Sequence, residues 1–280
     1  MSLTVAQRTN AEGFPKAGEL IEITGTAMLE ASDRAILNLL YQHAHDSGQF
    51  AEPDAAFELP ITDLLPSSHS STDRVRESLA RLLDIKVQVP IKHPRTGRPA
   101  SLMTHLFSSF VIPETAEPGN PTTVRYRIPS ELLPVLLTSN RWGRIKAETV
   151  CAMASKYAIT LYELLQLRAS MDRSVEVFPI TRFRELMGVP PGTYHDGTNF
   201  VRKVIEPALL EVNALSDLGV AAEVRRRSPR APIEAVVMTW WKKEGDQFRE
   251  AIREREQPKL GRRARLKAQI ETSASAQLTD

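Results

Sequence analysis

The chain has 280 residues, 42% of them hydrophobic and 25% charged, and a formal net charge of +2 at pH 7, a composition typical of a soluble protein with one large or two ordinary domains. The sequence excludes a transmembrane protein, because no apolar run approaches the roughly 18 residues that cross a bilayer. It also excludes a disulfide framework, because Cys151 is the only cysteine. We expect no signal peptide, no membrane partner and a cytoplasmic location.

The charges are distributed unevenly along the chain. Residues 1–60 hold nine Asp or Glu against three Lys or Arg, whereas Arg and Lys gather at 225–230 and 259–267. Segregation of this kind favours a polyanionic partner for the basic end, although a solvated surface with a basic tail gives the same pattern.

The first half contains a helix, strand and hairpin pattern. Residues 1–30 are weakly periodic and predict a partly ordered N-terminal arm. Apolar residues at helical spacing predict helices from Ala31 to Gly48 and over 72–85. A short strand, a helical turn and three further strands complete the pattern, in the order 57–60, 61–65, 87–91, 102–112 and 122–128. With a basic turn at 93–99 as the wing, this order predicts a winged helix over residues 31–139.

The same order returns in the second half. The pattern predicts a long helix over 147–169, a strand over 175–178, a short helix that ends at Gly188, and a helix from Asn199 that Pro207 should kink or divide. Two strands, 220–224 and 233–241, then enclose a basic turn. This order predicts a second winged helix over 147–243, followed by a charged, partly disordered tail over 244–280, with an exposed helix over 242–256 and disorder at 268–280.

The predicted fold class is therefore α+β and mainly helical, with two tandem winged helix-turn-helix domains. A single α+β domain with two unrelated hairpins is the alternative. A winged helix places one helix in a DNA major groove, so double-stranded DNA is the predicted partner. The competing interpretation of the cationic side chains is an ordinary solvated face.

Twelve residues are candidates for DNA contact. The N-terminal end of a recognition helix enters the groove, where Asn and Arg read base edges and Lys suits phosphate. The second domain supplies its helix residues Asn199, Arg202 and Lys203 and its wing residues Arg225, Arg226, Arg227 and Arg230. The first domain supplies Arg74, Arg76 and Arg81 on its helix and Arg95 and Arg98 around Gly97 at the hairpin tip.

One pattern suggests an enzyme. His43-Ala-His45 matches the paired histidines of rolling-circle nucleases, which use a metal and a tyrosine nucleophile. Such chemistry needs both rings on one side of a strand, but these residues have helical spacing, and in a helix residues two apart diverge by about 200°. Phosphate-binding glycine motifs and zinc spacings are also missing from the sequence. We therefore expect a protein that is not an enzyme, with no catalytic residue, metal or cofactor.

Residues 155–241 resemble the C-terminal winged helix of the iteron-binding plasmid replication initiators, the Rep proteins of theta-replicating plasmids. Four segments carry the resemblance: Ser155-Lys-Tyr-Ala-Ile-Thr-Leu-Tyr-Glu-Leu-Leu165, Ile180-Thr-Arg-Phe-Arg-Glu-Leu-Met-Gly-Val189, Tyr194, and Phe200-Val-Arg-Lys-Val-Ile-Glu-Pro-Ala-Leu-Leu-Glu-Val-Asn213. Residues 31–150 are similar to the family's N-terminal winged helix in layout.

The resemblance implies a function. Such a protein binds directly repeated origin DNA as a monomer, and as a homodimer, formed through its N-terminal domain, it represses its own promoter. The host replication initiator and helicase are implied partners. DNA contacts are implied for Asn199, Arg202, Lys203 and the second wing. This chain departs from the family in having a less basic recognition helix and an arginine-rich tail after Trp241. A winged-helix repressor without an origin role and a nickase using His43 and His45 are the alternatives.

Overall fold

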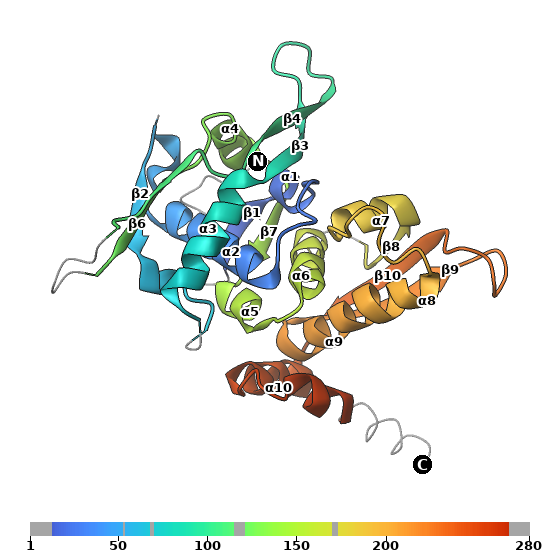
Figure 1. Ribbon diagram of the computed structural model, residues 1–280. Coiled ribbons are helices and arrows are strands. Elements are labelled where there is room, and N and C mark those ends of the chain that lie inside the picture. The colour runs from blue at the N-terminus through green and yellow to red at the C-terminus, as the bar shows by residue number, and fades with distance from the viewer. Residues whose placement is uncertain (1–12, 53, 68–69, 115–120, 170–172, 269–280) are drawn as a thin grey trace.

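Two units with the same element order follow one another along the chain in the computed structural model (Figure 1). The structure describes residues 13–52, 54–67, 70–114, 121–169 and 173–268. In each unit a helix is followed by a strand, two helical segments and a β-hairpin. The predicted fold class, α+β with two tandem winged helices, is confirmed. Among the described residues, no helix has both the length and the apolar character that a membrane crossing requires.

The first unit is built around helix α2. Its elements are α2 (Ala31–Asp46), η3 (Gln49–Ala51), β2 (Phe57–Pro60), η4 (Ile61–Leu64), α3 (Thr72–Asp84), β3 (Lys86–Lys92), β4 (Pro99–His105), β5 (Ser109–Val111) and β6 (Thr123–Arg127). A capping box begins α2, in which Asp33 accepts the backbone N–H of Glu30 at 2.9 Å. Tyr126 on the central strand β6 donates to the carbonyl of Leu40 at 2.7 Å, which fixes the sheet on α2.

The second unit repeats this arrangement around helix α6. Its elements are α6 (Lys156–Arg168), β8 (Val175–Pro179), α7 (Ile180–Leu186), α8 (Gly197–Phe200), the π-helical turn η5 (Val201–Ile205), α9 (Glu206–Leu215), β9 (Leu218–Arg225) and β10 (Ala235–Lys242). Every residue from Tyr157 to Arg168 is buried, which makes α6 the central helix of the molecule.

The sheets of the two units share one topology. The strand order is β2-β6-β5 in the first unit and β8-β10-β9 in the second, antiparallel throughout. In each sheet the strand after the first helix pairs with the last strand of the unit. The two halves thus share strand pairing as well as element order, without obvious sequence similarity.

The hairpin β3–β4 does not belong to either three-stranded sheet. It forms its own two-stranded sheet and projects from the body of the first unit (Figure 1). The predicted strand over 102–112 is in fact two strands, β4 and β5, because the buried residues Leu106 and Phe107 interrupt it. The wing of the first unit is therefore the β5–β6 hairpin, and the predicted wing at 93–99 is the tip of an additional hairpin.

The prediction of a partly ordered arm is corrected for residues 14–30. Strand β1 (Phe14–Ala17) pairs antiparallel with β7 (Trp142–Ile145), and α1 (Gly18–Ile21) follows directly. Phe14 and Ala17 are fully buried. Pairing with a segment more than 120 residues away leaves no local sequence signal, so the weak periodicity of this region was misleading.

The region that joins the two units contains α4 (Leu133–Thr138), β7 and α5 (Ala147–Ala152). The predicted helix over 147–169 is broken between α5 and α6. At the break, Glu211 of α9 accepts the backbone N–H groups of Ala154 and Ser155 at 2.9 and 3.0 Å. A carboxylate at a helix N-terminus satisfies donors that have no partner inside the helix, so this contact stabilises the break.

Helix α10 (Gly245–Glu256) forms where an exposed helix was predicted, and it packs beside α9 (Figure 1). Residues 262–268 add a further helical segment. The predicted disordered end falls on residues 269–280, outside the described part of the chain, apart from Ala268.

Candidate nucleic-acid interface

A single long helix formed by α8, η5 and α9 occupies the recognition-helix position of the second unit (Figure 1). It begins at Asp196, whose side chain accepts the backbone N–H of Asn199 at 2.9 Å. Pro207 was expected to kink or divide this helix. The regular α-helix is indeed divided there: the π-helical turn ends at Ile205, and Pro207 lies in the first turn of α9, where its missing N–H is tolerated.

The two sides of this helix differ in character. Its buried side consists of Phe200, Val204, Ile205, Ala208, Val212 and Leu215. The solvent side carries Arg202 and Lys203, both exposed, and Asn199, which is half-buried. Arg202 Nη2 donates to Asn199 Oδ1 at 2.8 Å, so these two side chains form one hydrogen-bonded pair near the N-terminal end of the helix.

Arg184 of α7 holds the loop that leads into this helix. Its guanidinium donates to the carbonyls of Thr193 and Tyr194, the latter at 3.2 Å, and lies 5.0 Å from the ring centroid of Phe200. Sequence reasoning assigned Arg184 no role, although it lies inside a segment that carried the family resemblance. The loop and the helix start are thus fixed by one side chain.

The wing of the second unit is the β9–β10 hairpin. Arg226 Nη1 donates to the carbonyl of Ala231 at 2.6 Å, and its guanidinium lies against Gly197, where an added Cβ would approach Nη2 to 2.5 Å. Arg226 therefore connects the wing to the first turn of the recognition helix.

The other wing arginines extend into solvent. Arg227 Nε lies 2.5 Å from Glu234 Oε1 in an exposed ion pair. Arg225 and Arg230 are exposed, and their side chains make no hydrogen bond or ion pair with another described residue. The wing thus carries three arginines that are exposed to solvent, Arg225, Arg227 and Arg230.

The candidates on α3 of the first unit divide by role. Arg74 is exposed near the N-terminal end of α3. Arg76 Nη2 donates to the carbonyl of Pro113 at 3.1 Å and so fixes the chain after β5. Arg81 donates from Nε and Nη2 to the carboxylate of Asp33, at 3.0 and 2.9 Å.

Arg81 therefore has a partner inside the protein, and its contact with DNA stays a prediction. Asp33 is fully buried, and a buried carboxylate is costly unless a cation pairs with it, which is what Arg81 of α3 does. The hydrogen bonds to Asp33 raise the pKa of Arg81, so the guanidinium is held in its charged form. We assign Arg81 to holding α3 on α2.

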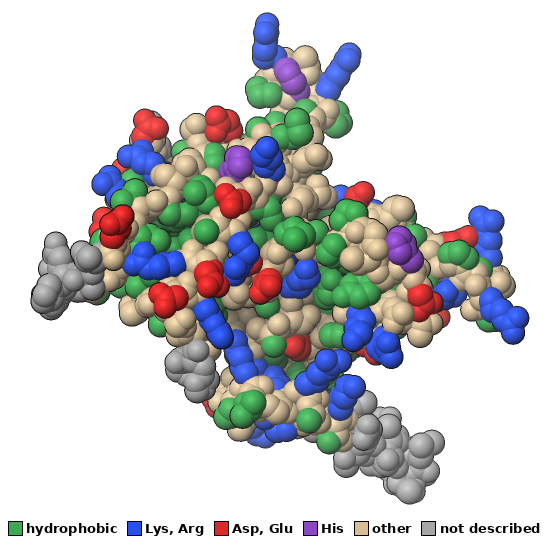
Figure 2. Space-filling model, viewed as in Figure 1, with side chains coloured by type: hydrophobic (Ala, Val, Ile, Leu, Met, Phe, Trp, Pro, Cys, Tyr) green, Lys and Arg blue, Asp and Glu red, His purple; other side chains and the backbone are tan. Residues whose placement is uncertain are grey.

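Arg95 and Arg98 lie at the tip of the β3–β4 hairpin, beside Gly97, whose φ of 66° needs a glycine. Figure 2 shows cationic side chains and a histidine projecting at this tip, far from the wing of the second unit. The structure thus places these two candidates on a projection of their own, away from α3 and from the recognition helix and wing of the second unit.

His43 and His45 do not form a shared site. His43 Nδ1 lies 3.0 Å from the hydroxyl of Tyr126, and burial lowers the pKa of His43. His45 Nδ1 lies 3.0 Å from Asp46 Oδ1. Within the described residues, no group of three or more His, Cys, Asp or Glu is placed to hold a metal ion. The pairing that a nickase needs is not formed.

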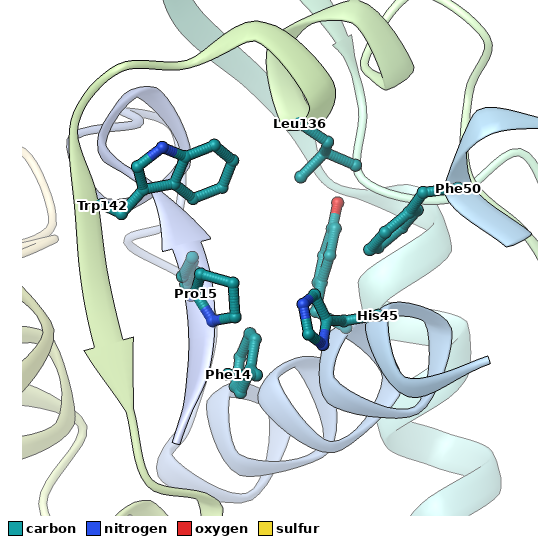
Figure 3. A pocket seen from close by; sticks show the side chains of 8 residues that line it. Phe14, Pro15, His45, Phe50, Leu136 and Trp142 are labelled. Carbon is teal, nitrogen blue, oxygen red and sulfur yellow. The ribbon is translucent and has the colours of Figure 1, made fainter. Parts of the chain in front are cut away.

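A small cavity lies beside His45. Figure 3 shows Phe14, Phe50, Leu136 and Trp142 around it, with the imidazole at one edge. His45 Nε2 is buried there without a partner among the described residues. The cavity of about 10 Å³ is at the lower limit for one water molecule, so it is no substrate site.

Comparisons with known families agree with this architecture. The family model described as "Initiator Replication protein, WH1" matches residues 15–166. The model described as "Initiator Rep protein, WH2" matches residues 179–240. The chain belongs to the initiator replication protein family. Residues 241–280 of this initiator, which include α10, lie outside both matches.

A solved structure has the same fold. The crystal structure of the Pi initiator protein in complex with iteron DNA aligns with a TM-score of 0.59 and 14% sequence identity, over 84% of this chain and 100% of that chain. At this identity the likeness establishes the fold. No curated protein sequence matches this initiator significantly.

Proposed function

We propose that this initiator replication protein binds double-stranded DNA repeats (iterons) at a plasmid origin, with the helix α8–η5–α9 in the major groove. The observation that carries the proposal is the hydrogen-bonded pair of Asn199 and Arg202 on the solvent side of this helix. The pair lies near the start of the helix, which Asp196 caps, and Arg184 binds the loop before it. The complex of the Pi initiator with iteron DNA supports it by likeness of fold.

The candidate residues of the second unit have three roles in this proposal. Asn199 and Arg202 present an amide and a planar guanidinium, the groups that read adenine and guanine edges bidentately. Lys203, Arg225, Arg227 and Arg230 contact phosphates, which adds affinity and salt dependence without sequence preference. Arg226 positions the wing against Gly197.

The first unit supplies a second, weaker set of contacts in this proposal. Arg74 is an exposed cation near the start of α3, the recognition-helix equivalent, and Arg76 lies on the same helix. Arg95 and Arg98 would reach DNA only beyond the body of the protein, at the tip of the β3–β4 hairpin.

The remaining predictions belong to the same proposal. The protein binds DNA without making or breaking bonds and without a cofactor. A homodimer that represses the protein's own promoter, a monomer active at the origin, and contacts with the host replication initiator and helicase stay predictions from family resemblance. So does the division into domains at 31–139 and 147–243.

Footprinting on supercoiled plasmid DNA that flanks the gene tests the proposal. We expect protection of direct repeats by the wild-type protein, reduced protection by Asn199→Ala/Arg202→Ala, and wild-type protection by the control Arg173→Ala, an exposed arginine paired with Glu176. Protection of inverted repeats alone would support a repressor. Nicking that His43→Ala abolishes would support the nickase.

A further inference from the structure

A wide groove lies between the solvent side of the recognition helix and the C-terminal segment, beside the contact of α10 with α9. One wall is the solvent side of α8–η5–α9, including Arg202 and Lys203, and the other is formed by α10 and residues 257–267. The groove encloses about 1470 Å³. In the space-filling view, Lys and Arg side chains lie along both sides of the hollow between α9 and α10 (Figure 2).

The C-terminal wall is firmly attached to the body of the protein. Arg262 is 5% exposed and donates to the carbonyls of Ala152 and Gln257, at 2.6 and 2.7 Å, and to Glu254 Oε1 at 3.1 Å. Arg255 Nη1 donates to Thr149 Oγ1 at 2.7 Å. These contacts join residues 255–262 to α5, so the second wall is held in place without closing the groove.

The groove carries an excess of positive charge. Seven Lys or Arg residues line it against three Glu. Three of the cations already have partners: Lys243 donates to the carbonyl of Ser216 at 2.9 Å at the end of α9, Arg265 donates to Glu254 at 2.8 Å, and Arg202 donates to Asn199 at 2.8 Å. Burial lowers the pKa of Lys243 to about 8, although Asp217 and Glu250 favour its charged form.

The other groove cations have free side chains. Lys203, Arg253, Arg263 and Lys267 make no side-chain hydrogen bond or ion pair with another described residue. Cations on facing walls repel one another across the groove, and a polyanion between them would remove that repulsion. The indole of Trp241 also lines the groove, 44% exposed and lying against Gly219. It offers an apolar surface beside the cations.

We propose that the segment 245–268 is a second DNA-binding element, which contacts the phosphodiester backbone bordering the major groove that α8–η5–α9 occupies. The DNA strand then lies in the groove between the two walls. This inference rests on the proposed function, because only a duplex docked on the recognition helix brings phosphates to Arg253, Arg263 and Lys267. The segment lies outside the residues that the two family models match.

DNA is favoured over an acidic protein as the occupant because the groove is continuous with the solvent side of the recognition helix. Lys203 belongs both to the groove and to the solvent side of the recognition helix. A duplex on that helix therefore extends into the groove without a second docking event, whereas an acidic peptide would compete with the duplex for Arg202 and Lys203.

The test uses the full-length variant Arg253→Ala/Arg263→Ala/Lys267→Ala. Its affinity is measured by fluorescence anisotropy from 50 to 300 mM KCl on two labelled 40-bp duplexes, one carrying the footprinted repeat and one of mixed sequence. We expect the slope of log affinity against log salt to become less steep by about 2 to 3, since each phosphate contact contributes about 0.9. We expect affinity near 150 mM salt to fall by about ten- to a hundredfold on both duplexes.

The matched control is a pair of single substitutions on α10. Arg253 lines the groove, whereas Arg249, one turn earlier, does not and is paired with Asp246 at 3.3 Å. Arg253→Ala should reduce the salt slope by about 0.9, and Arg249→Ala should leave it unchanged. The ratio of affinities for the two duplexes should stay at its wild-type value in all three variants, because backbone contacts carry no sequence information. Thermal unfolding confirms that the variants are folded.

The outcomes separate this inference from the proposed function. Suppose that Asn199→Ala/Arg202→Ala lowers the ratio of affinities for the repeat and the mixed-sequence duplex, while the triple variant keeps the wild-type salt slope. The recognition helix then remains the DNA reader, and the proposal of a second DNA-binding element is overturned. Tighter binding by the triple variant also overturns it, because the segment would then shield the recognition helix. If the wild-type protein binds neither duplex, both proposals fail. If a poly-glutamate peptide binds the wild type but not the triple variant, and the salt slope on DNA is unchanged, the groove belongs to an acidic protein.

A cleavage experiment locates the segment on the DNA. Gln257 lines the groove, and in a Cys151→Ala background Gln257→Cys can be labelled with an iron chelate that cuts nearby backbone. We expect strand cuts at one border of the protected repeat. Uncut DNA under conditions of full protection would contradict the placement.

Discussion

Lys16 Nζ lies 2.9 Å from Glu163 Oε1, and both side chains are almost completely buried, 3% and 6% exposed. Lys16 belongs to strand β1 and Glu163 to the central helix α6, so this ion pair joins the N-terminal strand to the core of the second unit. Asn38 of α2 completes the cluster by donating to the same carboxylate oxygen at 2.7 Å. Burial lowers the pKa of Lys16, against the effect of the Glu163 carboxylate. The junction between the two winged helices therefore depends on charges that have no access to water.

Removing one partner of this pair should destabilise the protein strongly. Glu163→Gln leaves the Lys16 ammonium buried without a counterion, which we expect to lower the free energy of unfolding by about 3–5 kcal/mol. Urea unfolding measures the change. The control is Glu185→Gln, which removes an exposed partner of Arg182 and should cost less than about 1 kcal/mol. Equal costs in the two variants would contradict a structural role for the pair.

Glu22 should make the stability of the protein sensitive to acid. Burial raises the pKa of Glu22, but hydrogen bonds from Arg141 and Arg168, both at 2.8 Å, outweigh burial and leave the pKa below its ordinary value. A carboxylate with a lowered pKa stabilises the folded state above the unfolded pKa of about 4.5 and loses this contribution as the pH falls through the folded pKa. Glu22→Gln should therefore be less stable than the wild type at pH 7, and the difference should shrink below about pH 4.5. A difference in urea midpoint that is constant from pH 7 to pH 3 would contradict this account.

Arg74 and Arg81 should respond oppositely to substitution, although both lie on α3. Arg81→Ala leaves the buried Asp33 without its bidentate partner and should cost about 2 kcal/mol of stability. Arg74→Ala removes an exposed side chain, so it should leave stability unchanged and weaken DNA binding. Chemical unfolding and anisotropy on each variant check the pair. Loss of DNA affinity by folded Arg81→Ala, with unchanged stability, would show that Arg81 serves DNA contact and not the fold.

The contact between Arg226 and Gly197 can be tested by a double-mutant cycle. Gly197→Ala should displace only the flexible end of Arg226, so it should lower DNA affinity with little effect on stability. Combined with Arg226→Ala, it should cause no further loss, because the contact is already gone. Combined with Arg230→Ala, which has no such contact, its effect should be additive. Additivity in both combinations would show that Arg226 does not position the wing through Gly197.

Local patterns were sufficient to predict much of the second unit. The recognition helix followed from apolar residues at helical spacing, Phe200 to Val212, and the wing from three consecutive arginines between two strands. Its exposed candidates Arg202, Lys203 and Arg225 are where that pattern placed them, on the solvent side. Pro207 marked the division of this helix correctly, but the π-helical form of the turn before it is not visible in a spacing rule.

Long-range pairing explains what the sequence did not reveal. Strand β1 finds its partner β7 near residue 144, and the first wing is separated from α3 by the additional β3–β4 hairpin. Neither relationship has a local signature. The role of Arg81 was missed for the same reason, because Asp33 is 48 residues away in sequence. Arg184 and Asp196 hold the start of the recognition helix by hydrogen bonds to backbone atoms. Such bonds do not depend on the side chain of the partner residue, so they leave only a weak signal in the sequence.

The most direct test of DNA reading by α8–η5–α9 is a base-preference measurement. Affinities of the wild type and of Arg202→Ala are compared on a set of duplexes in which each base pair of one repeat is changed in turn. We predict that Arg202→Ala loses about 1–3 kcal/mol on the unchanged repeat and no longer discriminates at one or two adjacent base pairs, while preference elsewhere is kept. Wild-type affinity and wild-type preference at every position in Arg202→Ala would contradict the assignment of this helix as the DNA reader.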